Sequence, residues 1–443
     1  MGGFITTVMH RDARQSWRRR LIPSSPSRTE SQPSRHRTGA DVTDVLLCQR
    51  FLPEHGGSIR WMYEVYRRWP GPVEVVTHDY YGAPPRTAEF PDAPQRPAGG
   101  DHVTAANLKV DRRDLFMRGW GVDRPSHLVR YLRMTRAIGE RLRRGGRVRV
   151  HCIHAVPEAA SLLPLKALYR DRLKIISYAH GEEITACESS RQLRWLMRQS
   201  HRGVALMLAN SRYTRDLVSN YIDPARVQVV HPGVEMSGFA QALELGRRWR
   251  TEQGLGERRI LLTVGRLDPR KNHAAVIESL ASLGERHADV LYIIAGEGRH
   301  RPVLERRAAE LGLAERVRFV GAVDGRLKLA LFGACDVFAM PAIREGTDVE
   351  GFGMVFLEAA ACGKPSLAGI AGGQADAVDH ERTGLVVDGT DREAVTAALD
   401  RLLSDKRWRT GLGEAAYGWA HQFDWDRVVQ RTVQLVEDTT GDP

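Results

Sequence analysis

Short apolar runs, many of them β-branched, alternate with stretches of helix length from residue 42 onward. A run that is apolar at every position is typical of a strand in a parallel sheet, because helices bury both of its faces. The runs fall into two series, which predicts two doubly wound α/β domains. The predicted strands are 45–48, 73–78, 147–153, 174–179 and 204–209 in the first series, and 260–265, 290–296, 317–321, 336–340 and 384–387 in the second.

The boundary between the two series falls in HPGVEMSGF, residues 231–239, where Pro232 and Gly233 end a strand without starting a helix. We therefore expect an N-terminal domain over 42–232 and a C-terminal domain over 233–421. The last segment, 422–438, has the pattern of an amphipathic helix. Paired domains of this kind bind ligands beyond the carboxyl ends of their strands, where the loops converge.

Composition narrows the class of protein. A chain of 443 residues with 42% apolar and 27% charged residues has enough material for two or three globular domains. No stretch approaches the ~18 to 20 unbroken apolar residues of a membrane-spanning helix, so we expect a soluble protein. The five cysteines lie far apart without a CxxC pair, which argues against a zinc or disulfide framework and suits the cytoplasm.

The net charge of +11 is unevenly distributed. Residues 1–40 hold eight arginines against Asp12 and Glu30, a net charge of +6, in a Ser- and Pro-rich segment with few apolar residues. We interpret 1–41 as a disordered basic tail. A transit peptide and a myristoylated start at MGGFIT are the alternatives. Nucleic-acid binding would require basic and aromatic residues together on a folded face, so no nucleic-acid partner is expected.

The stretch 340–365 carries the most chemistry. It leaves a strand, passes through a polar loop with glycines and enters a helix over about 354–361. Gly351 and Gly353 let the backbone approach a ligand closely at the start of that helix, where free N–H groups and the helix dipole favour a phosphate. The pattern therefore predicts a phosphate-binding loop.

Two carboxylates flank this loop: Glu350 precedes it and Glu358 lies on the helix. A ribose on one side and a hexose on the other would give them hydroxyl donors. The alternative is a capping acid plus a solvated helix glutamate. Because Glu358 lies inside the apolar run FLEAAAC, where an unpartnered carboxylate would be expensive, we favour a binding role.

A basic loop, TVGRLDPRKNH, spans residues 263–273. Arg266 follows a predicted strand directly, and Lys271 comes five residues later. Two cations at the carboxyl end of a strand suit a diphosphate. An arginine at such a position is commonly structural, but together with the glycine-led helix start it favours a binding site.

Two loops of the first series are further candidates. FLPEHGGS, residues 51–58, places Gly57 between the first strand and a helix, where the backbone can approach phosphate or sugar. YAHGEE, residues 178–183, places His180 at the end of a strand. A single histidine is more often structural, so position alone leaves its role open.

Two other motifs do not fit their usual functions. GEGRHR, residues 296–301, has Arg301 where a dinucleotide fingerprint requires its third glycine. DWD, residues 424–426, has the form of a metal-binding DxD but opens the terminal helix, so we interpret it as a helix start. No cluster has the pattern of a dedicated metal site, and none is expected.

DVEGFGMVFLEAAACGKP, residues 348–365, resembles the E-x7-E region of the retaining family-four glycosyltransferases, with Glu350 and Glu358 at the two glutamates. VGRLDPRKN resembles that family's phosphate loop, with Arg266 and Lys271 at its two cations. HPGVE resembles the interdomain hinge, HGEE the segment with a sugar-contacting histidine, and residues 371–387 the donor-side loops. The resemblance runs from about residue 42 to the end and is stronger in the second half.

The resemblance implies the GT-B fold, in which two Rossmann-like domains face a cleft and the terminal helix crosses back to the N-terminal domain. It implies that Glu358 binds the ribose hydroxyls and that Arg266 and Lys271 bind the diphosphate. Glu350 would contact the donor sugar, and His180 would reach it from the other domain as a second catalytic residue. The remaining implied donor-binding residues are Gly57, Gly351, Phe352, Gly353 and Met354.

The resemblance also implies a mechanism without metal or cofactor, since basic side chains and a helix dipole offset the charge of the leaving diphosphate. The nucleotide-sugar is a substrate. The family's proposed reaction is a front-face displacement in which the departing phosphate helps to deprotonate the acceptor hydroxyl. Domain closure would exclude water, which otherwise hydrolyses the donor.

Residues 338–363 most resemble bacterial mannosyltransferases that act on phosphatidyl-inositol mannosides. GDP-mannose is therefore the expected donor, with UDP-hexoses next, and a glycan or lipid-linked hydroxyl is the expected acceptor. Asp376 stands where many relatives have Glu, and Gln374 where they often have Val or Ala. Residues 80–150 resemble no particular relative, so the acceptor stays open, as does the oligomeric state.

Two further hypotheses remain. One is a nucleotide-sugar 2-epimerase, which the E-x7-E loop disfavours, and the other is a non-catalytic nucleotide-sugar-binding protein.

Two segments of the first half also suggest contact with a membrane. The helix-like segment 130–147 is strongly basic and LFMRGWG, residues 115–121, is aromatic and apolar. Such a pair can bind an anionic lipid surface, which would place the protein at the cytoplasmic face of a membrane. A solvated helix face beside a buried core is the alternative.

Overall fold

The computed structural model describes residues 42–54, 56–80, 105–117, 119, 121–122, 124–323 and 325–441. The predicted tail over 1–41 lies outside the described residues, as does much of the predicted acceptor side, 81–104.

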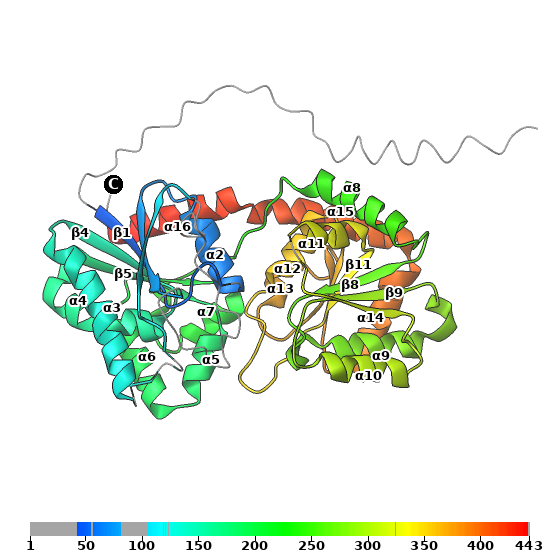
Figure 1. The fold of residues 1–443 in the computed structure, drawn as a ribbon, viewed down its shortest axis with the longest axis horizontal. Coiled ribbons are helices and arrows are strands. Elements are labelled where there is room, and N and C mark those ends of the chain that lie inside the picture. Colours follow the sequence, from blue (N-terminus) through cyan, green and yellow to red (C-terminus); the bar gives the residue numbers. More distant parts are fainter. Residues whose placement is uncertain are drawn as a thin grey trace, which may run out of the picture. The chain divides into compact units, whose positions relative to one another are not determined.

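The described part of the first half forms a seven-stranded parallel sheet of order β3-β2-β1-β4-β5-β6-β7 (Figure 1). Its central strands are buried on both faces because apolar helices cover them, as the unbroken apolar runs predict. The strands are β1 (Val42–Leu47), β2 (Val73–His78), β3 (Leu108–Arg113), β4 (Arg147–Cys152), β5 (Leu173–Ala179), β6 (Leu206–Ala209) and β7 (Val227–Val229).

Two hydrophobic clusters lie on the two faces of this sheet. One contains residues of the helices that follow β3 to β6, and the other contains residues of the helix after β1 and of the last helix of the chain. The helices of this half are α2 (Gly57–Tyr66), α3 (Pro125–Arg143), the π-helix η1 (Ala155–Ala159), α4 (Leu163–Tyr169), η2 (Arg170–Arg172), α5 (Glu182–Glu188), α6 (Arg191–Gly203), α7 (Arg212–Val218) and η3 (Pro224–Arg226).

The second half forms a six-stranded parallel sheet of order β10-β9-β8-β11-β12-β13. Helices again bury both faces. Its strands are β8 (Ile260–Val264), β9 (Leu291–Ala295), β10 (Val317–Gly321), β11 (Val337–Met340), β12 (Ser366–Gly369) and β13 (Gly384–Val387). Its helices are α8 (Phe239–Glu252), η4 (Pro269–Lys271), α9 (His273–Leu283), η5 (Gly284–His287), α10 (Arg301–Glu310), α11 (Gly325–Ala334), α12 (Met354–Ala361), α13 (Gln374–Ala377), α14 (Arg392–Ser404), α15 (Lys406–Ala420) and η6 (His421–Phe423).

All ten predicted strands are present, and the described residues contain three further strands that were not predicted. β3 has the sequence LKVDRR, in which charged residues hide the apolar signal of an edge strand. β7 has three residues and β12 has the weakly apolar sequence SLAG. Short or polar strands are recognised only through their neighbours in the sheet.

The last helix, α16 (Trp425–Thr440), returns to the first half, as the resemblance implies. Residues of one face, including Trp425 and Val436, join the hydrophobic cluster of α2, and the red α16 lies beside the blue α2 in Figure 1. The carboxylate of Asp424 accepts a hydrogen bond of 3.0 Å from the backbone N–H of Asp426, so DWD is a helix start, as predicted. Among the described residues, no helix is both long and apolar enough to cross a membrane.

Two chain segments that link the halves meet beside α16. The backbone N–H of Val234 donates to the carbonyl oxygen of Phe423 at 2.8 Å, and Val234 forms a parallel bridge with Asp424. A Cβ atom on Gly233 would lie 2.5 Å from the indole ring of Trp425. The glycine of HPGVE is therefore required by this close packing.

Candidate active site

The glycine-led loop before α12 approaches the first half directly. Gly353 has φ of 87°, and a Cβ atom there would lie 2.6 Å from the ring of Phe356, so only glycine fits. A Cβ atom on Gly351 would lie 2.0 Å from the carbonyl oxygen of His180. The loop from the second half and the end of β5 from the first half are thus in contact.

Glu350 lies partly buried between two cations of the basic loop. Lys271 Nζ is in close contact with Glu350 Oε2, and Arg270 Nη1 donates to the same oxygen at 2.9 Å. Burial by itself would raise the pKa of Glu350, but Lys271 and Arg270 outweigh it and lower the pKa to about 2. The structure therefore brings together two loops that the sequence could only suggest as neighbours, and it adds Arg270 to the candidate residues.

Arg266 is placed differently. Its side chain is 70% exposed, and its ion pair with Asp268 spans 3.4 Å. Lys271 is buried, and burial lowers its pKa despite the opposing charge of Glu350. Of the two residues predicted to bind the diphosphate, Arg266 can bind an anion without losing a close partner. Lys271 must first break its ion pair with Glu350.

Glu358 also pairs with two cations, one from each half. Arg60 Nη1 on α2 donates to Glu358 Oε1 at 2.6 Å, and Lys328 Nζ on α11 donates to the same atom at 2.7 Å. Burial tends to raise the pKa of Glu358, and the two cations lower it overall. Sequence reasoning missed both cations. Arg60 had a weak signal, since it lies one helical turn after the glycines of FLPEHGGS.

The first turns of α2 and α12 lie close together. A Cβ atom on Gly57 would meet Met354 Cε at 3.5 Å, an ordinary contact distance. One turn further on, Arg60 and Glu358 form the ion pair described above. Two helix N-termini with their free N–H groups therefore lie near the same place, an arrangement that favours a bound anion.

His180 is buried, with its Nε2 atom 3.0 Å from the carbonyl oxygen of Ile153. A carbonyl can only accept, so Nε2 carries the proton and Nδ1 is an acceptor. Burial, followed by the charge of His154, lowers the pKa of His180 to about 3. The backbone N–H of His180 donates to Glu183 Oε1 at 2.7 Å, which fixes the strand end. His180 is thus a neutral hydrogen-bonding group at neutral pH.

The two positions that depart from the family pattern have structural partners. Asp376 accepts hydrogen bonds from the backbone N–H of Arg212 at 2.6 Å, from Arg212 Nε at 2.7 Å and from His231 Nε2 at 3.1 Å. Burial would raise the pKa of Asp376, but these bonds lower it to about 2. Gln374 is buried and bonds to backbone atoms of Ala342 and Gly369, which ties α13 to the loop after β11 and to the end of β12.

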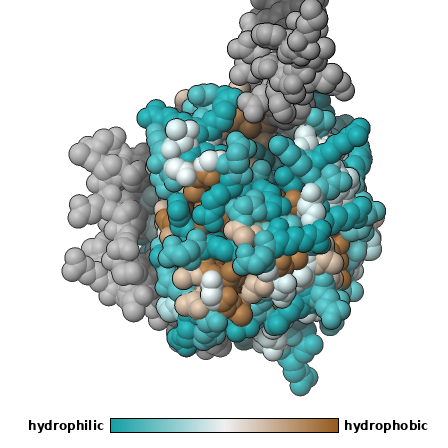
Figure 2. All heavy atoms as spheres, turned by 90° about the vertical axis from the view of Figure 1, so that its right-hand side faces the viewer, coloured by the Kyte–Doolittle hydropathy of each residue, from teal (hydrophilic) through white to brown (hydrophobic). Residues whose placement is uncertain are grey.

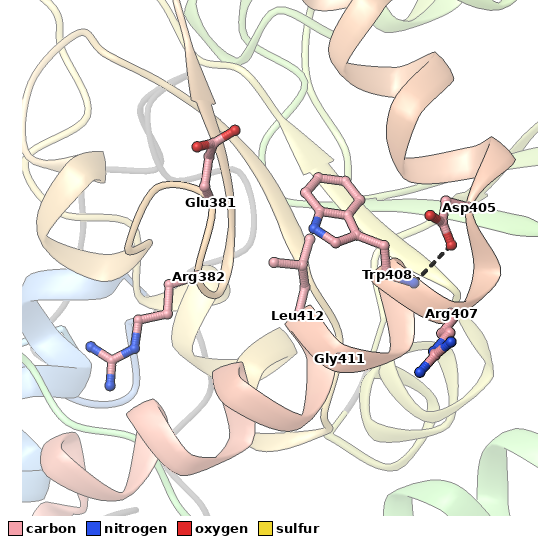
Figure 3. A pocket seen from close by; sticks show the side chains of 7 residues that line it. All are labelled: Glu381, Arg382, Asp405, Arg407, Trp408, Gly411 and Leu412. Atoms are coloured by element: carbon pink, nitrogen blue, oxygen red, sulfur yellow. Dashed lines mark hydrogen bonds between the residues drawn. The ribbon is translucent and has the colours of Figure 1, made fainter.

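A hollow of about 540 Å³ lies elsewhere in the second half, between α15 and the loop before β13. Figure 3 shows the side chains that line it. Glu381, Arg382 and Trp408 line it, and Asp405 in its wall caps α15 by accepting from the Trp408 N–H at 2.8 Å. None of the candidate site residues lines this hollow. Within the described residues, no group of three or more His, Cys, Asp or Glu side chains is placed to hold a metal ion.

Two family models match adjacent parts of the chain. Residues 55–237 match the model described as Glycosyltransferase Family 4, and residues 247–419 match the model described as Glycosyl transferases group 1.

Similar proteins include a GDP-mannose-dependent alpha-(1-6)-phosphatidylinositol monomannoside mannosyltransferase of Mycobacterium tuberculosis. It is 33% identical over 406 residues, which cover 88% of this chain and 97% of the relative. A D-inositol 3-phosphate glycosyltransferase of Salinispora tropica is 39% identical over 312 residues, which cover 66% of this chain and 60% of the relative. The crystal structure of Anabaena HepE in complex with UDP covers 89% of this chain and 100% of its own at a TM-score of 0.70 and 17% identity, a likeness of fold alone.

Proposed function

The chain belongs to the retaining family-four glycosyltransferases and has their GT-B fold, and on that premise we propose that it transfers mannose from GDP-mannose to a hydroxyl group of a lipid-linked acceptor. The choice of donor and acceptor rests on one observation. The mycobacterial relative that this chain matches over 97% of its length is named for GDP-mannose and a phosphatidylinositol mannoside.

In this proposal, residues 233–421 bind the donor, and residues 42–232 with the terminal helix bind the acceptor. Glu358 accepts from the ribose hydroxyls, Arg266 and Lys271 bind the diphosphate, and Glu350 contacts the sugar. The backbone N–H groups of residues 351–354 cap the diphosphate at the start of α12. The contact between Gly351 and the carbonyl of His180 supports a site shared by both halves.

Donor binding then exchanges partners rather than creating unpaired charges. The diphosphate takes Lys271 from Glu350, and Glu350 gains hydroxyl donors from the sugar. The ribose takes Glu358 from Arg60 while Lys328 stays in place. Each partly buried carboxylate keeps a partner throughout, which matters because a fully buried charge without compensation costs about 3–5 kcal/mol.

The chemistry follows from this arrangement. The retaining reaction breaks the bond between the anomeric carbon and the diphosphate, and the acceptor oxygen attacks from the same face. The proton of the acceptor hydroxyl passes to the departing diphosphate. Arg266, Lys271 and the start of α12 stabilise the developing negative charge of the leaving diphosphate. We propose that His180, neutral and buried, orients a hydroxyl group of the donor sugar through Nδ1.

A binding and transfer panel tests the donor. GDP, UDP and ADP are compared by thermal shift, and a donor nucleotide at 100 times its Kd should add about 2.7 kcal/mol of stability. GDP-mannose and UDP-glucose are then compared for transfer to phosphatidylinositol in mixed micelles, in EDTA. Preference for UDP would reject GDP-mannose. Binding of GDP-mannose with neither transfer nor slow hydrolysis would favour a binding protein, and loss of UDP-GlcNAc to an epimer without acceptor would favour an epimerase.

A surface of the first half supports a membrane-bound acceptor. Of the seven large apolar side chains that are exposed among the described residues, five lie on α3, α4 and α6, and α4 contacts both other helices. We call this surface, with its neighbouring arginines, the α3–α4–α6 face. The five side chains are Leu128, Val129, Leu132, Leu168 and Trp195.

The α3–α4–α6 face is also basic. The helix α6 has the sequence RQLRWLMRQSHRG, with four arginines and no acid, and Trp195 on it is 59% exposed. Figure 2 looks at the second half, whose visible surface is mainly hydrophilic, and only Val303 and Ile370 are exposed large apolar residues in the described part of that half. Apolar side chains set among arginines suit an anionic lipid surface, so we propose that this face docks on the membrane that holds the acceptor.

A further inference from the structure

A second hollow, of about 400 Å³, lies where the two connections between the halves meet. Residues of both halves and of the terminal helix line it. Arg212 and Val229 come from the first half, and Asp376 and Trp419 from the second. Phe423 comes from the segment that links α15 to α16, and Arg427 from α16 itself. None of the residues proposed to bind the donor lines this hollow.

One wall of the hollow is aromatic. The ring of Phe423 lies 5.4 Å from that of Trp419 and 5.5 Å from that of His231, centroid to centroid. Val229 and Val428 add aliphatic surface. This wall can pack against the C–H face of a sugar or polyol ring.

The side of the hollow formed by α16 is basic. Arg427 and Arg431 are exposed, lie four residues apart on one helix face and both line the hollow. Neither forms an ion pair with any described residue, whereas Arg212 in the same hollow is bound to Asp376. Like charges at this spacing repel each other and destabilise a helix, so an anion placed between them would be stabilised. Paired guanidinium groups suit phosphate in particular.

We propose that this hollow binds a small phosphorylated sugar or polyol, with its phosphate on Arg427 and Arg431 and its ring on Phe423 and Trp419. A volume of about 400 Å³ lies within the range of small-molecule sites. The hollow shares no lining residue with the residues proposed to bind the donor, but its His231 stacks on Phe352 of the glycine-led loop with ring centroids 5.3 Å apart. This proposal goes beyond the transferase function.

Its position gives the ligand a regulatory effect. A bound ligand touches Asp376 and Trp419 of the second half together with Arg427 of the terminal helix, which packs on the first half. Any change in the relative position of the halves would change these contacts, so the ligand binds one arrangement better than another and shifts the population toward it. Transfer would then respond to the ligand without competition for the donor.

Calorimetry on the full chain tests the site directly, with glucose 6-phosphate, inorganic phosphate and glucose as probes. Glucose 6-phosphate should bind more tightly than phosphate, and glucose should not bind. The double substitution Arg427→Gln/Arg431→Gln should weaken glucose 6-phosphate at least ~10-fold, since it removes both charge-assisted contacts. GDP affinity should stay within about twofold in that variant, because the donor site is elsewhere. Calorimetry requires no transferase activity, so its result tests this binding site independently of the proposed function.

The matched control is Arg306→Gln/Arg407→Gln, which lowers the net charge equally. It removes two other exposed arginines, on α10 and α15, that form no ion pair with a described residue. It should bind glucose 6-phosphate as the unchanged chain does. Equal weakening of glucose 6-phosphate binding in both variants would attribute the effect to net charge and overturn the proposal. Displacement of glucose 6-phosphate by GDP, absence of binding, or arginine-dependent binding to phosphatidylglycerol vesicles alone would also overturn it. Saturating glucose 6-phosphate should alter kcat with donor KM unchanged, and only where Arg427 and Arg431 are present.

Discussion

Arg60 and Glu358 join the two halves of the molecule, with the guanidinium Nη1 of one 2.6 Å from the carboxylate Oε1 of the other. The carboxylate that we assign to the ribose is therefore paired with a cation of the opposite half. Lys328 shares the same oxygen from within the second half. If Glu358 binds the ribose as proposed, the pair couples nucleotide binding to the contact between α2 and α12.

Removal of Arg60 tests this coupling. In Arg60→Ala, the ribose no longer competes with a guanidinium for Glu358, while Lys328 still neutralises the carboxylate. We expect GDP to bind up to ~5-fold more tightly, a modest gain because Arg60 is partly exposed to solvent. Isothermal titration calorimetry measures it. The control Arg67→Ala, which removes the arginine that follows α2 and pairs with Glu64, should leave GDP affinity unchanged. Weaker GDP binding in Arg60→Ala would make Arg60 a ligand contact instead.

Glu350→Gln separates sugar contact from nucleotide binding. The amide keeps the shape of the side chain but releases Lys271 and Arg270 from its charge. We expect kcat to fall at least ~100-fold, while GDP binds as well as before or better because Lys271 is free for the diphosphate. Steady-state kinetics and calorimetry on the same preparation measure both. Near-normal kcat with weakened GDP binding would assign Glu350 to the nucleotide rather than the sugar.

Acid should destabilise the protein through Glu350 and Asp376, whose pKa values are both lowered to about 2. A carboxylate whose pKa is lower in the folded chain stabilises the fold above its unfolded pKa, near 4, and that contribution is lost as pH falls toward 2. Each group contributes on the order of 2–3 kcal/mol at neutral pH.

Chemical denaturation between pH 7 and pH 2.5 measures whether the free energy of unfolding falls as the pH is lowered. The free energy of unfolding should be nearly flat from pH 7 to 5 and fall below that. In Asp376→Asn the fall should be smaller, whereas Asp216→Asn, at an exposed position, should reproduce the unchanged curve. A wild-type curve that rises toward acid pH would contradict the assignment.

The glycine contacts predict different effects of a glycine-to-alanine substitution at two positions. Gly351→Ala would place a methyl group 2.0 Å from the carbonyl oxygen of His180 and should cost about 1–3 kcal/mol or more of stability. Gly57→Ala would meet Met354 Cε at 3.5 Å and should leave thermal stability nearly unchanged. Differential scanning calorimetry compares them. Equal melting temperatures would show that α12 and β5 do not pack as described.

The membrane proposal has a matched pair of variants. Leu132→Glu/Trp195→Glu places charge on the α3–α4–α6 face, and Val303→Glu/Ile370→Glu does the same to the exposed apolar residues of the second half. Sedimentation with phosphatidylglycerol vesicles should fall at least ~10-fold in the first variant and remain in the second. Binding should also weaken as salt is raised. Binding that neither variant changes would place any lipid contact on another surface.

The sequence by itself determined the two series of buried strands, the helix start at Met354 and the loops that carry Arg266, Lys271, Glu350 and Glu358. These features are local, since apolar runs and glycines restrict the backbone wherever they occur. Only the tertiary structure decided which charges meet. Arg60 and Glu358 lie 298 residues apart in the chain, and Asp376 finds Arg212 across 164, so no local pattern records either pair. The same holds for the five apolar side chains of the α3–α4–α6 face, because packing alone leaves them exposed on three neighbouring helices.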